Sequence, residues 1–292
     1  MAGSGWTTTS SLEDSLDQVA SSARSVREYE GVMTQLVETR TLGVGMGLEW
    51  RELTYAQLVA QAVTETTELN NPQQITDTEI TITPTMAAVE TFITDRVGLR
   101  ISPAGNAQIG SLGQKALQRK KDEDGLTVLN SGLTTSEPGA GNTLASGFIA
   151  AAQANISANT TEGARPPFAA VLHGFQIKDL YDELVAGVGT YILTEGPTAR
   201  VFGSAFNLPI ANALVVADNN ITIDSSDDAP GGVFAKEGIV LVQGRAARIV
   251  AERNEARGGG GFHVYHYDEY AFGQRLALWV HRMKSDATAP TS

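Results

Sequence analysis

A few short patterns in this sequence could support chemistry, and each also has a plainer interpretation. The run Gly43-x-Gly45-x-Gly47 resembles a phosphate-binding loop, but a dinucleotide fingerprint needs wider glycine spacing between a strand and a helix. The acidic run Asp224–Asp228 offers oxygen ligands to a cation, but it lacks the spacing of an EF-hand loop. We therefore interpret the first pattern as a flexible hairpin element and the second as a solvated turn.

The other reactive side chains are also poorly placed for catalysis. His263 and His266 are three residues apart, and a strand directs such residues to opposite faces, so they cannot chelate one metal. The run Asp122–Asp124 follows Lys120 and Lys121, which is typical of a charged helix face. The chain has no Cys, and no GxSxG elbow occurs. The sequence therefore predicts no catalytic residue, no cofactor site and no metal site.

The overall composition restricts the partners. The 292 residues carry a formal net charge of −12, and 42% of them are hydrophobic. A globular chain is expected, and the carboxylate surplus argues against a protein that grips nucleic acid through Lys and Arg. No stretch approaches the roughly 18 apolar residues of a membrane span, so no membrane partner is expected.

The elements that must position these residues follow a definite order along the chain. Alternating β-branched residues predict strands over 75–101, and the apolar residues Ile109, Leu112, Ala116 and Leu117 predict a long helix over 104–131. Glycines at 113 and 125 weaken the expectation of an unbroken rod. Further strands are predicted at Phe168–Leu172, Asn220–Ile223 and Arg275–Val280.

Taken together, several segments resemble the major capsid proteins of tailed bacteriophages of the Hong Kong 97 type. The resemblance covers most of the chain and rests on the combination rather than on any single motif. It is carried by these segments: Thr66–Thr83, Ile93–Arg96, Lys120–Leu126, Phe168–His173, Ile221–Asp228 and Asp286–Ser292.

The resemblance implies an α+β Hong Kong 97-like capsid fold. It implies a subunit that self-assembles into pentamers and hexamers, which close an icosahedral shell around double-stranded DNA. The implied parts are an N-terminal arm (1–39), an extended β-hairpin loop (40–75), a peripheral domain with a long spine helix (76–135 and 236–283), an axial α/β domain (136–235) and a C-terminal tail (284–292).

The same resemblance implies where neighbouring subunits touch. The extended loop would lie over a neighbour, with Met46, Leu48, Trp50 and Arg51 as contact residues, because large apolar side chains suit an interface better than solvent. The first three are expected near the tip of the loop. Trp6 in the arm and Pro290 in the tail would contact neighbours as well. One branch of the family joins subunits by a Lys–Asn isopeptide bond, and the absence of Lys from 40–75 predicts that this bond is missing here.

The implied partners are further copies of the chain, a separate scaffolding protein, a portal and a decoration protein. The scaffolding protein is expected to be separate because the region before the extended loop is short. Packaged DNA would lie near the subunit without specific contacts. The implied location is the virion, after assembly in the cytoplasm of the host bacterium. Two alternatives stay open: a soluble α/β enzyme built on 143–223, and another virion component such as a decoration or tail protein.

Overall fold

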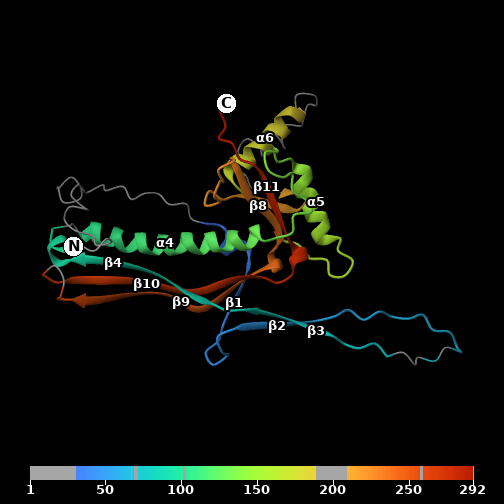
Figure 1. Cartoon of the computed structure of the whole chain (residues 1–292), viewed down its shortest axis with the longest axis horizontal. Helices are drawn as coiled ribbons and strands as arrows, with labels where there is room; N and C mark the ends of the chain where they lie inside the picture. The colour runs from blue at the N-terminus through green and yellow to red at the C-terminus, as the bar shows by residue number, and fades with distance from the viewer. Residues whose placement is uncertain are drawn as a thin grey trace.

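One long helix and three β-sheets organise the chain in the computed structural model (Figure 1). The structure describes residues 31–66, 68, 72–100, 103–188, 209–256 and 259–291. Within the helices α4 and α6 it describes the side chains of 110–130 and 174–183. The predicted α+β class is confirmed.

The first sheet has four strands in the order β1-β9-β10-β4. Strands β9 (Ile239–Asn254) and β10 (Gly261–Gln274) form a long antiparallel hairpin, and β4 (Thr85–Thr94) pairs with the other side of β10. The short strand β1 (Glu38–Thr41) runs parallel to the first part of β9. Between Arg245 and Asn254 no described strand pairs with the outer edge of β9.

Helix α4 (Pro103–Asn130) lies lengthwise over β10 and β4, and its glycines do not interrupt it. A Cβ at Gly113 would lie 2.5 Å from Cε1 of His266, and one at Gly125 would lie 3.0 Å from Cβ of Met33. Both glycines therefore permit close approach of the helix to its neighbours, which outweighs their weak helix propensity. The long helix predicted over 104–131 is confirmed.

The second sheet has five strands in the order β11-β8-β5-β7-β6. All five residues of the central β5 are buried, because α5 and α6 cover one face of the sheet and the end of α4 covers the other. The bounds are β5 (Phe168–Leu172), β6 (Pro209–Ile210), β7 (Ala213–Ala217), β8 (Asp228–Ala235), β11 (Val280–Asp286), α5 (Ser146–Ser157) and α6 (Gly174–Val188). Strands β5 and β7 are parallel and are joined through α6. This unit has its own apolar core.

The third sheet is a two-stranded hairpin that projects away from both other sheets (Figure 1). Strand β2 (Trp50–Tyr55) pairs antiparallel with β3 (Asp77–Ile82), and the register places Trp50 opposite Ile82. Ile82, at the root, is the one buried residue of the two strands. The remaining short elements are α2 (Met33–Leu36), α3 (Asp95–Gly98) and 3-10 turns at Lys236–Gly238 and Ala277–Trp279.

Two strand predictions are wrong. Asn220–Ile223 is irregular, because the Asp218 carboxylate accepts the Asn220 N–H at 2.9 Å and turns the chain after β7. Arg275–Val280 is interrupted by the 3-10 turn at Ala277–Trp279, with the chain crossing from the first sheet to the second. The last strand therefore begins at Val280.

The observed elements also differ in their bounds from the expected domains and loop. Because β11 pairs with β8, residues 280–283 lie in the five-stranded sheet, whereas the expected peripheral segment ran to 283. The hairpin strands span 50–82, whereas the extended loop was expected at 40–75. Strand β8 begins at Asp228, inside the stretch expected to be a polar turn.

Candidate assembly surface

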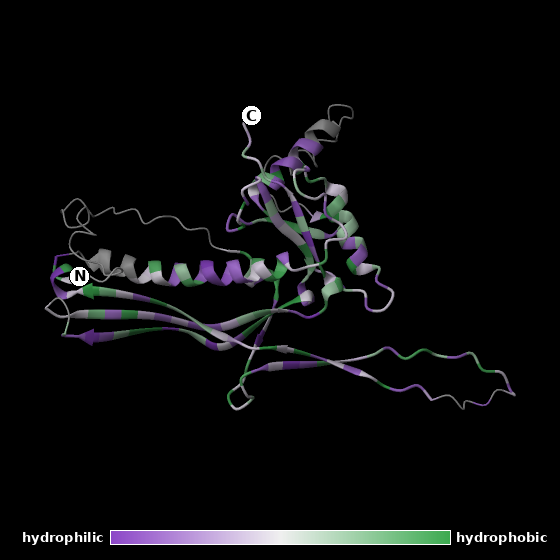
Figure 2. Cartoon of the chain, viewed as in Figure 1, coloured by the Kyte–Doolittle hydropathy of each residue, from purple (hydrophilic) through white to green (hydrophobic). Residues whose placement is uncertain are grey.

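The hairpin exposes apolar side chains that no described part of the chain covers. Figure 2 shows hydrophobic stretches along its extended part, away from both larger sheets. A soluble monomer rarely exposes so many apolar side chains in one region, so this surface is a candidate contact with another molecule. The exposed apolar residues of this region are Val44, Met46, Leu48, Leu53, Tyr55, Leu58, Val59, Val63 and Ile75.

A glycine-rich turn presents two of the predicted contact residues. Gly45 and Gly47 have φ angles of 88° and 87°, which a residue with a side chain adopts at a cost. The turn leaves Met46 68% and Leu48 81% exposed. It lies before β2, at the root of the hairpin rather than at its far end, where the sequence placed these residues.

The other predicted contact residues have different surroundings. Trp50 is half-buried and packs within the chain, in the small cluster around Ile82 and Val242 at the hairpin root. Arg51 is exposed and pairs with Glu49 at 2.9 Å. Pro290 is exposed, and Trp6 lies outside the described residues.

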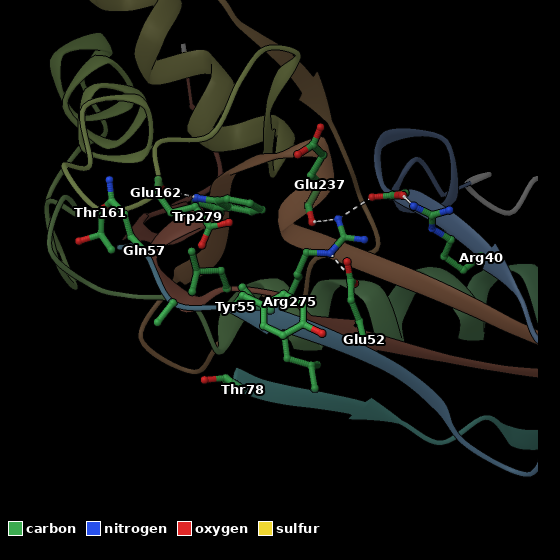
Figure 3. A pocket seen from close by; sticks show the side chains of 15 residues that line it. Arg40, Glu52, Tyr55, Gln57, Thr78, Thr161, Glu162, Glu237, Arg275 and Trp279 are labelled. Carbon is green, nitrogen blue, oxygen red and sulfur yellow. Dashed lines mark hydrogen bonds and ion pairs between the residues drawn. The ribbon is translucent and has the colours of Figure 1, made fainter. Parts of the chain in front are cut away.

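Arg275 fastens the hairpin root to the first sheet (Figure 3). Its Nε donates to Glu52 in β2 at 2.8 Å, and its Nη1 donates to Glu38 in β1 at 2.6 Å. Nη1 also donates to the backbone carbonyl of Glu237 at 2.9 Å. One guanidinium thus joins three chain segments, which sets the direction in which the hairpin leaves the body. Sequence reasoning missed this residue because its partners are remote along the chain.

The pKa shifts of Glu38 and Arg275 agree with close ion pairing at the hairpin root. Burial alone would raise the pKa of Glu38, but the guanidinium groups of Arg275 and Arg40 bring it below its ordinary value. Burial would lower the pKa of Arg275, and Glu38 and Glu52 raise it instead. Both shifts favour the charged forms of Glu38 and Arg275, so neither group is a poised acid or base.

A pocket of about 830 Å³ opens beside this root, between the hairpin and the loop that precedes β5 (Figure 3). Its wall includes Tyr55, Glu162 and Trp279, and Nε1 of Trp279 donates to the Glu162 carbonyl at 2.9 Å.

The hairpin and the outer strand of the first sheet differ in charge. From position 49 to position 82 one cation, Arg51, accompanies six carboxylates: Glu49, Glu52, Glu65, Glu68, Asp77 and Glu79. The exposed outer part of β9 carries Arg245 and Arg248, one carboxylate at Glu252, and Arg253, which already pairs with Asp95 at 3.0 Å. The two surfaces are complementary in sign.

The patterns that might have supported chemistry serve structural roles. His263 stacks with Tyr265, whereas His266 lies against α4 and faces the carbonyl oxygen of Gly110 at 3.0 Å, so the two imidazoles lie on opposite faces as predicted. Asp224 accepts Nζ of Lys284 at 2.9 Å and caps its own turn. Within the described residues, no group of three or more His, Asp or Glu side chains could hold a metal ion.

The interpretation of Asp122–Asp124 as a charged helix face holds for Glu123 and Asp124 and is wrong for Asp122, which is buried. Lys120 pairs with Asp124 at 2.6 Å along the helix, whereas Lys121 reaches across to Asp268 on β10 at 3.0 Å. No described helix is long and apolar enough to cross a membrane.

Comparisons with known proteins find likeness in structure but not in sequence. No protein-family model and no curated protein sequence matches the chain. Among solved structures, the chain is similar to the capsid of cyanophage P-SCSP1u (TM-score 0.67, 14% identity, covering 97% of this chain and 96% of that one). It is also similar to the mature capsid of bacteriophage PhiM1 (TM-score 0.66, 14% identity, 91% and 90%). The capsid of cyanophage Pam1 is a third match (TM-score 0.66, 11% identity, 99% and 100%).

At these identities the comparisons establish the fold. The chain has the fold of tailed-phage capsid subunits, the Hong Kong 97-like fold expected from the sequence resemblance.

Proposed function

We propose that this chain is the major capsid protein of a tailed bacteriophage, which self-assembles into the icosahedral shell that encloses the double-stranded DNA genome. The observation that carries the proposal is the whole-chain match to phage capsids, with both chains covered almost completely. A fold alone does not define a function, and the exposed hairpin provides the second observation.

The hairpin suits a subunit that is stabilised by packing against neighbouring subunits. A two-stranded hairpin is marginally stable alone, and its apolar side chains gain most when another surface covers them. Met46 and Leu48 on the glycine turn, together with the exposed apolar residues further along, would form this contact. Trp50 would contribute from the root and Arg51 from the polar rim.

The basic outer edge of β9 on a second copy fits the acidic hairpin. Opposite charge on two surfaces favours correct register and suppresses contacts between like surfaces. No described strand pairs with β9 beyond Gln243 on this edge, so its backbone donors and acceptors are available to an incoming strand. We place the hairpin of one subunit against this edge of the next.

The remaining parts follow from the same proposal. The four-stranded sheet with α4 would form the peripheral domain, and the five-stranded unit the axial domain of pentamers and hexamers. Trp6 and Pro290 would contact neighbours through the arm and the tail. A scaffolding protein, a portal and a decoration protein would be further partners, and the packaged DNA would lie near the shell without specific contacts. Assembly would occur in the host cytoplasm. The enzyme alternative is not favoured.

Negative-stain electron microscopy of the purified chain tests the proposal, with and without a scaffolding protein from the same source. Closed shells, tubes or rings of five and six subunits are the expected result. A uniform monomer or dimer at high concentration, with scaffold present, would contradict it.

A paired set of variants tests the contact residues. Met46→Ser with Leu48→Ser removes exposed apolar surface from the glycine turn, and we expect folded subunits that assemble at least tenfold less well. Leu99→Ser removes a similarly exposed side chain, 87% exposed, outside the hairpin region and serves as the control. Equal assembly of the double variant and the wild type would exclude this turn as a contact.

A further inference from the structure

Two buried carboxyl groups meet where three parts of the chain join. Asp122 lies in the middle of α4 and is 1% exposed, and Asp218 follows β7 and is fully buried. The third part is the segment Gly31–Met33, which leads into α2. The carboxyl groups therefore connect the first sheet, the second sheet and the start of the described chain.

The backbone of this segment lies against both carboxyl groups. Oδ1 of Asp122 accepts the N–H of Met33 at 2.9 Å, and the backbone N–H of Val32 is close enough to Asp218 to favour the charged form of its carboxyl group. A Cβ at Gly31 would lie 1.9 Å from Cγ of Asp122, so the segment lies directly against the helix. Oδ2 of Asp122 also accepts Nδ2 of Asn220 at 2.9 Å.

One oxygen of the pair has no donor among the described residues. Oδ2 of Asp218 is buried without a hydrogen-bond partner, and the Asp218 carboxyl group faces that of Asp122. Two ionised carboxylates cannot hydrogen bond to each other, and they repel strongly away from water. A single proton between them would satisfy this oxygen and remove the repulsion.

Among the described residues, the charged groups near the pair do not offset this repulsion. On α4, Lys121 turns to Asp268 at 3.0 Å, Lys120 pairs with Asp124 at 2.6 Å, and Glu123 is itself acidic. The segment 31–35 and the residues Asn219 and Asn220 carry no ionisable side chain. At the end of β5, burial lowers the pKa of His173 and favours its neutral form.

We propose that Asp122 and Asp218 share one proton, and that this proton holds Gly31–Met33 against α4 and the second sheet. Loss of the proton places two negative charges in the joint and loosens the attachment of the segment into which residues 1–30 lead. The joint is therefore tight in mild acid and loose in mild alkali.

The direction of the pH dependence follows from linkage. Burial, reinforced by the neighbouring Asp122, raises the pKa of Asp218 to about 7. With the segment attached, Asp218 keeps its proton up to about pH 7, whereas with the segment released it loses the proton above its ordinary pKa of about 4. The equilibrium for attachment therefore weakens as pH rises from about 4 to about 7 and is constant above that range. Between pH 6 and pH 8.5 a one-proton equilibrium of this kind changes roughly tenfold.

Hydrogen–deuterium exchange of the full-length chain tests the proposal, with rates corrected for intrinsic pH dependence. The amides of Val32 and Met33 are expected to lose about tenfold protection from pH 6 to pH 8.5, while those of β8 stay constant. Asp218→Asn replaces the shared proton by an amide N–H and is expected to remain protected at both pH values. Asp182→Asn makes the same charge change at an exposed side chain and should behave as wild type.

Two results would overturn the proposal: equal protection of the wild type at both pH values, or an unchanged pH response in Asp218→Asn. Infrared difference spectroscopy of the wild-type chain gives an independent test that needs no variant. A protonated-carboxyl band that titrates near neutral pH is expected, and its absence would exclude the shared proton.

Discussion

The hairpin and the five-stranded unit contain similar residue types but use them in opposite ways. In the unit around β5 the apolar side chains are buried against α5 and α6 on one face and against α4 on the other, so the fold is satisfied within one chain. In the hairpin most apolar side chains are exposed, and only the root residue Ile82 is buried in its strands. The first region is stabilised by its own core, whereas the second needs a surface that this chain does not supply.

The largest effect is expected when a buried side chain is removed from the core of the five-stranded unit. Leu172→Ala removes a fully buried side chain from the middle of the core. We expect a loss of about 2–5 kcal/mol in the free energy of unfolding, because the site cannot collapse to fill the space. Urea denaturation of the subunit measures this change. A loss below about 1 kcal/mol would mean that the unit is not the stable part of the chain.

The contact between α4 and the first sheet gives the next largest effect. Gly113→Ala places a methyl group 2.5 Å from the His266 ring, and we expect a destabilisation of roughly 1–3 kcal/mol. Gly110→Ala is the matched control, since a Cβ there meets nothing within 4 Å. That control should stabilise the chain by up to about 1 kcal/mol through helix propensity. Thermal unfolding compares the two, and similar shifts would contradict close packing at Gly113.

The attachment of the hairpin to the body is tested at Arg275. Arg275→Met keeps much of the apolar stem but leaves Glu38 and Glu52 without their shared cation. We expect a destabilisation of roughly 1–3 kcal/mol, together with faster amide exchange in β2 and β3 than in β5. Exchange that rises equally in all three strands would show that Arg275 supports the whole fold rather than the hairpin.

The smallest effect on the subunit is expected in the hairpin itself. Val59→Ser alters a side chain that is 71% exposed, so the free energy of unfolding of the isolated subunit should change by less than about 0.5 kcal/mol. The same variant should assemble more weakly if a neighbour covers this surface. A stability loss comparable to that of Leu172→Ala would remove the distinction between the two regions.

The sequence by itself determined the local elements and the family of folds. The apolar stripe of α4 and the continuous apolar run of β5 are encoded over short distances, and both were predicted with bounds close to those observed. The turn around Met46 was also encoded locally, since the glycine run at 43–47 predicts a hairpin element and Gly45 and Gly47 adopt positive φ angles.

The tertiary structure alone decided which remote residues meet. Arg275 joins Glu38 and Glu52, and Asp122 faces Asp218, across separations along the chain that no local pattern spans. Gly113 and Gly125 weaken a helix when only propensity is considered, yet they allow α4 to approach its neighbours. Local periodicity reports how a segment folds, whereas the pairing of charges and the closeness of packing depend on how segments are brought together in space.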